Sequence, residues 1–273
     1  MLLQPFAEDL AARLQLPTHS SVLELACGTG ILTRVLRSRL PASVNLIATD
    51  LNEPMFRHAA GKFVENEAVQ WQQADACSLP FANRMFDAVV CQFGLMFVPD
   101  KLLAAQEARH VLKPGGLFLF NVWDAMEHNA LGQLTHRIIA SYFEKDPPAF
   151  YQVPFGYHDQ REIKRVLKEA EFNEIRTEVV TKASRIGRAE DAATGLIHGN
   201  PVAVGIAERD PSLLPVISKA VAKAIDRSAR VGDGEVMQER PILEVNGAFR
   251  ETALGVGVDK NDLPFRGIPG VFP

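Results

Sequence analysis

Hydrophobic and polar residues follow two different periods along the first 125 residues. Short segments that are apolar throughout, or alternate every second residue, indicate strands; longer segments with apolar residues three and four positions apart indicate helices. The expected strands cover residues 21–26, 43–50, 68–75, 86–93 and 116–123. The expected helices cover residues 5–14, 31–40, 54–66 and 101–112, and a turn is expected at 113–116. Strands and helices that alternate with short connections predict an α/β fold with a doubly wound, mostly parallel sheet.

The regular alternation stops after Trp123. Residues 125–157 are rich in proline and aromatic residues, which predicts an irregular cover that follows a short helix. The remaining elements expected are a helix at 158–170, a strand at 172–180, alanine-rich helices from 184 to 234 and a last strand at 242–249. The chain is therefore expected to consist of a core at 1–124, a cap insertion at 125–157, a continuation of the core at 158–183, a helical cap at 184–240, a last core strand at 241–256 and a tail at 257–273.

The composition is that of an ordinary globular protein. Of the 273 residues, 47% are hydrophobic and 23% are charged, and the formal net charge is −4. Nucleic acids and anionic membranes are bound through clustered lysine and arginine, so neither is expected as a partner. The nearest approach to a basic run, at 161–168, has apolar residues at helical spacing and indicates the solvated face of a helix.

Cysteine content and hydropathy indicate a soluble protein of the cytoplasm. The three cysteines, Cys27, Cys77 and Cys91, form no Cys-x-x-Cys pair, so neither a disulfide framework nor a metal site is expected. Glu8 and Asp9 interrupt the N-terminal stretch where a signal peptide needs an unbroken apolar core. No stretch approaches the 18 uninterrupted apolar residues of a transmembrane helix, so no membrane span is expected.

The stretch VLELACGTG at 22–30 forms the first candidate site. Gly28 and Gly30 follow an expected strand and precede an expected helix, which lets a ligand approach bare backbone at the positive end of the helix. A dinucleotide site has a third glycine three residues further on, where this chain has Thr33. Glu24 is placed to hold the amides of the turn or, through water, the ammonium group of a ligand. The alternative is a purely structural turn with Glu24 at a solvent-exposed edge.

Two further acidic residues follow the next two expected strands. Asp50 is placed to accept hydrogen bonds from both hydroxyls of a ribose; an acid there can also cap the next helix, although Asn52 is better placed for that. Asp75 precedes an apolar Leu-Pro-Phe run, which suits the edge and faces of an adenine; the alternative is an exposed turn residue. Gly28, Asp50, Asp75 and Gln92 all fall at the carboxyl ends of expected strands, where ligands bind in such sheets.

Five stretches in this order resemble the successive motifs of S-adenosylmethionine-dependent methyltransferases with the Rossmann-like fold. They are VLELACGTG, IATDLNEPM, QQADACSLPF, FDAVVCQFGLMFVPD and ARHVLKPGGLFLFNVWD. Their spacing is most similar to the ubiquinone/menaquinone-biosynthesis methyltransferase-like branch, which acts on small molecules. The resemblance covers residues 5–125 strongly and 156–182 moderately. It implies a cofactor-binding Rossmann-like core at 1–124 and a seven-stranded sheet whose last strand is antiparallel, with helical cap insertions.

The resemblance also implies which residues hold S-adenosylmethionine, whose product is S-adenosylhomocysteine. The cofactor-binding residues that it implies are Glu24, Ala26, Gly28, Gly30, Asp50, Leu51, Met55, Asp75, Ala76, Gln92 and Phe93. The two glycines would line the methionine part with Glu24 nearby, and Asp50 would take the ribose hydroxyls. Leu51 and Met55 would flank the adenine, Asp75 and Ala76 would meet its edge, and Gln92 and Phe93 would face the sulfonium and the reacting methyl group.

Methyl transfer from a sulfonium is an in-line displacement with a neutral leaving group, so positioning supplies most of what the reaction needs. A base is required only when the acceptor must lose a proton; His128, His158 and His198 lie on the expected cap, and none is assigned a catalytic role. The chain lacks the Asn/Asp-Pro-Pro-aromatic signature of enzymes that methylate planar nitrogens. The apolar residues 94–98 and the aromatic residues at 143–157 indicate an apolar or aromatic small-molecule acceptor, or else simply form the core of the cap.

Two other classes of function are weighed against a methyltransferase. A nicotinamide-dependent oxidoreductase predicts a third loop glycine and a Tyr-x-x-x-Lys pair, and the chain has neither. A non-enzymatic regulatory protein that binds S-adenosylmethionine is compatible with the motifs, because the 20 residues before Ser21 are fewer than relatives usually carry to close the cofactor site. The sequence leaves open the acceptor, the methylated atom (oxygen, nitrogen or carbon), and whether the protein is a monomer or a homodimer.

Overall fold

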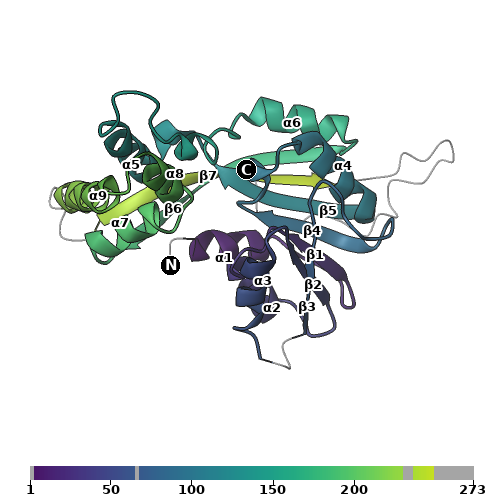
Figure 1. Ribbon diagram of the computed structural model, residues 1–273. Helices are drawn as coiled ribbons and strands as arrows, with labels where there is room; N and C mark the ends of the chain where they lie inside the picture. The colour runs from purple at the N-terminus through teal and green to yellow at the C-terminus, as the bar shows by residue number, and fades with distance from the viewer. Residues whose placement is uncertain (1–2, 65–67, 230–235, 249–273) are drawn as a thin grey trace.

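A computed structural model describes residues 3–64, 68–229 and 236–248 of the chain (Figure 1). Its centre is a seven-stranded sheet with the strand order β3-β2-β1-β4-β5-β7-β6. The strands are β1 (Ser21–Leu25), β2 (Asn45–Asp50), β3 (Val69–Gln73), β4 (Phe86–Gln92), β5 (Leu112–Trp123), β6 (Glu174–Ile186) and β7 (Val236–Ala248). The first five strands pair in parallel, and β7 pairs antiparallel with both β5 and β6. The expected α/β Rossmann-like class is confirmed.

Helices cover both faces of this sheet. They are α1 (Gln4–Ala12), α2 (Ile31–Arg39), α3 (Glu53–Ala60), α4 (Lys101–Val111) and α6 (Gln160–Glu169). The central strand β4 is apolar along most of its length, so its alternate side chains pack on opposite faces. On one face α4 and α6 cover Phe86, Phe118 and Phe172, and on the other face α1 and α2 cover Val22 and Val90. This two-sided burial fixes the positions at which the strands end.

Aspartate side chains begin two of these helices. Asp100 accepts the backbone N–H of Leu103 at 2.9 Å at the start of α4, and Asp159 accepts that of Arg161 at 2.8 Å at the start of α6. The first N–H groups of a helix have no partner within the helix, and an aspartate before it satisfies one of them.

Four further helices form a separate group, called here the helical lobe, beside the sheet (Figure 1). They are α5 (Ala130–Ala140), α7 (Ala189–Ile197), α8 (Val202–Arg209) and α9 (Leu213–Ala229). The lobe has a hydrophobic core of its own, which includes Ile139, Ile197, Ile206, Ile217 and Val221. The connecting segments contain the short 3-10 helices η1 (Leu95–Phe97), η2 (Met126–His128) and η3 (Phe150–Gln152).

Two expected element boundaries near the sheet differ from the structure. The helix expected to reach residue 66 ends at Ala60, because Gly61 follows there and has no side chain to support another turn. The turn expected at 113–116 lies inside β5, which begins at Leu112 and pairs with β4 through a local shift in register. The Lys-Pro-Gly-Gly sequence therefore bends a strand rather than preceding one.

The two strands that were expected to be short are long. β6 and β7 pair with each other along their whole length, from Glu174 opposite Ala248 to Ile186 opposite Val236. Mutual pairing satisfies the backbone of a two-stranded ribbon beyond the edge of β5, and no local periodicity in either segment signals it. The expected tail at 257–273 and the expected continuation of the last strand past 248 lie outside the described residues.

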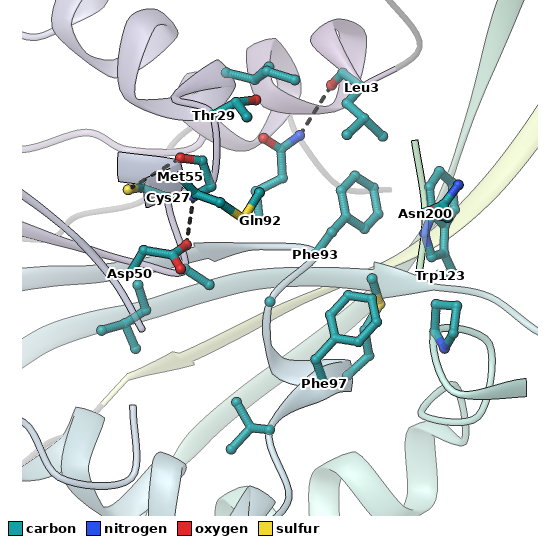
Figure 2. A pocket seen from close by; sticks show the side chains of 18 of the residues that line it. Leu3, Cys27, Thr29, Asp50, Met55, Gln92, Phe93, Phe97, Trp123 and Asn200 are labelled. Carbon is teal, nitrogen blue, oxygen red and sulfur yellow. Dashed lines mark hydrogen bonds between the residues drawn. The ribbon is translucent and has the colours of Figure 1, made fainter. Parts of the chain in front are cut away.

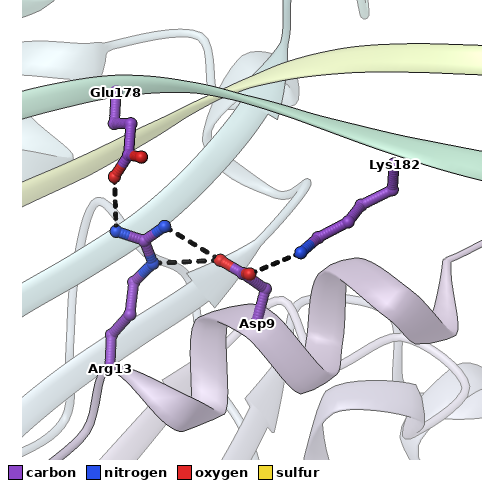
Figure 3. Close-up of polar contacts among 4 residues, drawn as sticks. All are labelled: Asp9, Arg13, Glu178 and Lys182. Atoms are coloured by element: carbon purple, nitrogen blue, oxygen red, sulfur yellow. Dashed lines mark hydrogen bonds and ion pairs between the residues drawn. The ribbon is translucent and has the colours of Figure 1, made fainter. Parts of the chain in front are cut away.

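Four charged side chains tie α1 to the outer strand β6 (Figure 3). Arg13 donates to Asp9 Oδ2 from Nε at 3.0 Å and to Glu178 Oε2 from Nη1 at 2.8 Å. Lys182 Nζ donates to Asp9 Oδ1 at 2.6 Å. Burial would raise the pKa of Asp9, but the hydrogen bonds from Lys182 and Arg13 outweigh burial and hold this pKa below its usual range. The contacts thus join the N-terminal helix to an outer strand of the sheet.

We expect Asp9→Asn to lower the free energy of unfolding by about 1 kcal/mol, which is a fall in Tm of ~2–4 °C, because these side chains are only partly exposed. Since folding lowers the pKa of Asp9, its stabilisation is present above the usual value of 3.8 and is lost as the pH falls through the folded value. Thermal unfolding followed by circular dichroism should therefore show a difference from wild type at pH 7 that shrinks in acid. Glu162→Gln, which breaks an exposed pair with Arg165, is the control and should leave Tm unchanged. Equal Tm values for Asp9→Asn and wild type at pH 7 would contradict the stabilising role of these contacts.

Candidate active site

A pocket of about 670 Å³ lies at the carboxyl ends of the central strands, between the sheet and the helical lobe (Figure 2). The loops that follow parallel strands meet at this edge, which is why residues far apart in the sequence converge there. Of the eleven predicted site residues, ten line the pocket: Glu24, Ala26, Gly28, Asp50, Leu51, Met55, Asp75, Ala76, Gln92 and Phe93. Gly30 does not line it.

The loop between β1 and α2 adopts an uncommon backbone conformation. Ala26, Gly28 and Gly30 have φ values of 53°, 55° and 81°, in the left-handed region that favours glycine. A Cβ atom at Gly30 would lie 3.0 Å from the Cβ of Ala59 on α3. Gly30, which was expected to meet the ligand, is buried here and allows α2 to begin close against α3, whereas Gly28 lines the pocket.

Asp50 connects two loops at the end of β2. Its Oδ2 accepts the backbone N–H of Gly28 at 2.8 Å, and its Oδ1 accepts that of Asn52 at 2.8 Å. The side chain is nearly buried, and Asn52 rather than Asp50 is the residue that precedes α3. Each carboxylate oxygen can accept more than one hydrogen bond, so Asp50 holds the loops and still has acceptor capacity toward the pocket.

Glu24 is a buried acid within β1. It is 1% exposed, and its Oε2 has no hydrogen-bond partner among the described residues. Burial raises the pKa of Glu24 to about 8; the hydroxyl and the amide of Thr33 oppose this rise, and the nearby charge of Asp50 adds to it. The alternative with Glu24 at a solvent-exposed edge is wrong, because β1 is the third of seven strands and is covered on both sides.

The part of the pocket beside Asp50 has an open, partly apolar rim. Leu51 and Met55 are 64% and 40% exposed. Asp75 is an exposed turn residue, as the alternative for it stated, and its Oδ1 accepts the N–H of Cys77 at 2.8 Å. It nevertheless lines the pocket together with Ala76. Exposed apolar side chains beside a carboxylate can contact a flat heterocycle on its faces and on its polar edge.

Gln92 and Phe93 line the pocket and also contact the N-terminal segment of the chain. Gln92 Nε2 donates to the carbonyl oxygen of Leu3 at 3.1 Å (Figure 2). The Phe93 ring stacks on Trp123 with 4.4 Å between the ring centroids, and the Phe6 ring of α1 meets it edge-on at 5.7 Å. Phe93 therefore forms part of a rigid aromatic wall, which adds packing contacts to the role that was expected of it.

The other end of the pocket is aromatic. Phe97 lies parallel to Phe150 with 6.4 Å between centroids, and Tyr151 lies parallel to Phe155 at the same distance. The lining residues that sequence reasoning missed include Leu3, Trp123, Asn129, Leu131 and Asn200. They come from the ends of elements and from the helical lobe. Trp123 lies within the last of the five motifs but was not assigned to the site. No motif marks the other four, because only the tertiary fold brings their segments to the strand ends.

The three candidate histidines lie outside the pocket lining. His128 Nδ1 is 2.8 Å from a carboxylate oxygen of Asp124, and this hydrogen bond raises the pKa of His128. His158 bonds to a backbone carbonyl, and His198 Nε2 is 3.1 Å from Ser218 Oγ. Each of the three side chains therefore has a polar contact outside the pocket.

The described residues contain neither a readily ionised thiol in the pocket nor a cluster of metal ligands. Burial raises the pKa of Cys91 to about 12 and also raises that of Cys27, so both thiols are protonated and unreactive at neutral pH. In residues 3–64, 68–229 and 236–248, no group of three or more His, Cys, Asp or Glu side chains is arranged to hold a metal ion. The same part of the chain contains no helix that is both long and apolar enough to cross a bilayer.

A sheet of this order, with a glycine-containing loop after β1 and an acid at the end of β2, defines a Rossmann-like protein with a nucleoside-cofactor site. Among known families, the methyltransferase domain matches residues 23–120. The demethylmenaquinone methyltransferase of Staphylococcus aureus (strain MRSA252) is 30% identical over 170 residues, which is 58% of this chain and 70% of that protein. The chain belongs to the S-adenosylmethionine-dependent methyltransferases, and its cofactor is S-adenosylmethionine. A nicotinamide-dependent oxidoreductase is not supported.

Solved structures share the fold at low sequence identity. The YcgJ protein of Bacillus subtilis has a TM-score of 0.58 at 18% identity, over 90% of this chain and 99% of that one. Phosphoethanolamine N-methyltransferase 2 of Haemonchus contortus, solved with phosphomonomethylethanolamine and S-adenosylhomocysteine, has a TM-score of 0.55 at 14% identity, over 90% of this chain and 53% of that one. At such identities these likenesses establish the fold alone.

The contact between Gly30 and α3 can be tested by comparing two glycines. Gly30 and Gly115 have φ values of 81° and 80°, but a Cβ atom at Gly115 meets nothing within 4 Å. We expect both Gly→Ala substitutions to cost about 1–2 kcal/mol for the left-handed backbone. We expect Gly30→Ala to cost at least about 1 kcal/mol more, because its methyl group presses on Ala59. Urea unfolding measures both, and equal losses would refute the close approach of α2 and α3.

Proposed function

We propose that this enzyme transfers the methyl group of S-adenosylmethionine to a small apolar or aromatic acceptor. The observation that carries the proposal is the division of one pocket into a polar end around Asp50 and an aromatic end around Trp123. Residues 125–157 and the helices within the expected range 184–240 would act as the cap over the acceptor, because the missed lining residues Asn129, Leu131 and Asn200 come from these segments.

Four features of the polar end support a placement of the cofactor there. Asp50, with acceptor capacity left after its two backbone contacts, would bind the ribose hydroxyls. Glu24, whose Oε2 lacks a partner, would bind the ammonium group of the methionine part beside Gly28. The exposed side chains of Leu51 and Met55 would flank the adenine, with Asp75 and Ala76 at its edge. When bound, S-adenosylmethionine supplies an electrophilic methyl group on a sulfonium.

The remaining chemistry is positioning by the chain itself. The aromatic faces of Phe93 and Trp123 favour a positive charge nearby and exclude water from the acceptor. Gln92 donates to the carbonyl of Leu3, and its amide oxygen, to which no described residue donates, would orient a donor group. The described lining contains no histidine, lysine or arginine, so a general base of these types would not be available to the acceptor.

Binding of S-adenosylhomocysteine tests the cofactor site directly. We expect calorimetric titration to show micromolar-range binding and no signal with NADH. Asp50→Ala should weaken binding about 100-fold or more, because two charge-assisted hydrogen bonds are lost. Asp159→Ala is the matched control: it removes the same kind of carboxylate-to-backbone contact, two residues along the chain, at a site outside the pocket. A folded protein that fails to bind S-adenosylhomocysteine would refute the cofactor assignment.

Proton release on binding tests the role of Glu24. Because its pKa is raised to about 8, Glu24 keeps its proton at pH 7 in the free protein, and a ligand ammonium group would favour the ionised form. Titrations in phosphate and in Tris, which differ in ionisation enthalpy, should reveal release of most of one proton with S-adenosylhomocysteine. They should reveal none with 5′-methylthioadenosine, which lacks the ammonium group, and none with Glu24→Gln. Equal proton release by the two ligands would show that Glu24 does not face the ammonium group.

Methyl transfer itself separates the proposal from the regulatory alternative. A screen of small aromatic acceptors with S-adenosylmethionine should yield a methylated product. Tight cofactor binding together with no product from any acceptor would favour a protein that binds the cofactor without catalysis.

A further inference from the structure

Two asparagine side chains stand at the aromatic end of the pocket with their amide groups fixed in one orientation. Asn129 lies in the connection between β5 and α5 and is 4% exposed. Its Nδ2 donates to the carbonyl oxygens of Asp124 and Ala125, both at 3.1 Å. The side-chain NH₂ group has two hydrogens, and both are used by the backbone.

Asn200 repeats this arrangement from the helical lobe. Its Nδ2 donates to the carbonyl oxygens of Gly195 at 3.1 Å and Leu196 at 3.0 Å, at the end of α7. Exchanging the nitrogen and oxygen of either amide would place an oxygen against two carbonyl oxygens, so the orientation is determined by the contacts. Among the described residues, no donor reaches Oδ1 of Asn129 or Asn200. Both residues therefore offer the pocket an acceptor only.

Apart from the indole N–H of Trp123, the neighbouring aromatic lining residues offer a ligand no hydrogen-bond donor. The hydroxyl of Tyr151 donates to the carbonyl oxygen of Leu196 at 2.6 Å, and the rings of Phe93, Phe97 and Phe155 are apolar. No lysine, arginine or histidine lines the described pocket, so nothing there offsets a negative charge. An acceptor that a bound ligand cuts off from water without supplying a donor costs free energy, so a pocket lined with such acceptors disfavours ligands that lack the donor.

We propose that Asn129 and Asn200 determine the specificity for the methyl acceptor. The acceptor would be a neutral or cationic molecule with an aromatic body and a hydroxyl or amine hydrogen that it donates to an asparagine Oδ1. Carboxylates and phosphates are disfavoured, because they bring further acceptors and a charge without a counter-ion. This inference rests on the proposed function, since it takes the aromatic end as the place of the acceptor.

Three probes with the same aromatic body test the inference on protein saturated with S-adenosylhomocysteine. They are 2-naphthol, which has a donor, 2-methoxynaphthalene, which has only an acceptor, and 2-naphthoate, which is an anion. Ligand-observed NMR titration gives the three dissociation constants. We expect 2-naphthol to bind about tenfold more tightly than 2-methoxynaphthalene, the effect of one hydrogen bond, and 2-naphthoate to bind most weakly.

The variant Asn200→Leu tests whether the preference for 2-naphthol over 2-methoxynaphthalene depends on Asn200. Asn200→Leu keeps the size of the side chain and removes its oxygen, so the preference for 2-naphthol should fall at least about threefold while binding of S-adenosylhomocysteine is retained. Asn83→Leu makes the same chemical change in an exposed turn away from the pocket and should leave the preference intact.

Several results would overturn the inference. These are equal binding of 2-naphthol and 2-methoxynaphthalene to the wild type, strong binding of 2-naphthoate, no binding of any probe, or an unchanged preference in Asn200→Leu. If Asn200→Leu does not fold, the order of the three dissociation constants for the wild type still tests the inference. Failure to bind S-adenosylhomocysteine would instead contradict the proposed function, so the two failures are distinguishable.

Discussion

Asp50 ends β2 with a carboxylate whose two oxygens accept amide hydrogens from different loops, Gly28 after β1 and Asn52 before α3. Parallel strands leave such loops with unpaired N–H groups at the carboxyl edge of the sheet, and an acid at that edge satisfies two of them at once. The loop at Gly28 has a left-handed backbone that needs support from outside itself. The geometry of the polar end of the pocket therefore depends on one side chain, and the proposed ribose contact would use the same atoms.

Glu24 and Asp50 are neighbouring acids that differ in the hydrogen bonds their carboxyl oxygens accept. Asp50 has an amide donor at each oxygen, whereas Glu24 Oε2 has no partner and burial raises the pKa of Glu24 to about 8. A buried carboxyl group that stays neutral costs the fold less than a buried charge, which is how β1 accommodates an acid between two apolar layers. The same environment makes Glu24 responsive to a cation, because a ligand ammonium group would supply the charge that the protein lacks there.

The sheet and the polar end of the pocket could be predicted because they follow from local pattern: strands of period two, glycines, and acids at strand ends. Gly30 shows the limit of that pattern, since a glycine that admits a ligand and one that admits a neighbouring helix look alike in sequence. Leu3, Asn129 and Asn200 could not be predicted, because they reach the pocket only through the packing of α1 and the helical lobe against the sheet. The length of the pairing between β6 and β7 could not be predicted either, because it depends on contacts between two segments that are far apart in the sequence.

The aromatic end of the pocket is assembled from the N-terminal segment and from the helical lobe. Leu3, directly before α1, accepts the hydrogen bond of Gln92 at its carbonyl oxygen, and α1 contributes the Phe6 ring to the wall of Phe93 and Trp123. Asp9 on α1 holds this helix to β6 through Lys182. The helical lobe contributes Asn200 from the opposite side. None of these segments carries the loops around Asp50. On the proposed function, changes in the lobe would alter which molecule accepts the methyl group while the cofactor contacts stay as they are, so specificity and cofactor binding can vary independently in this fold.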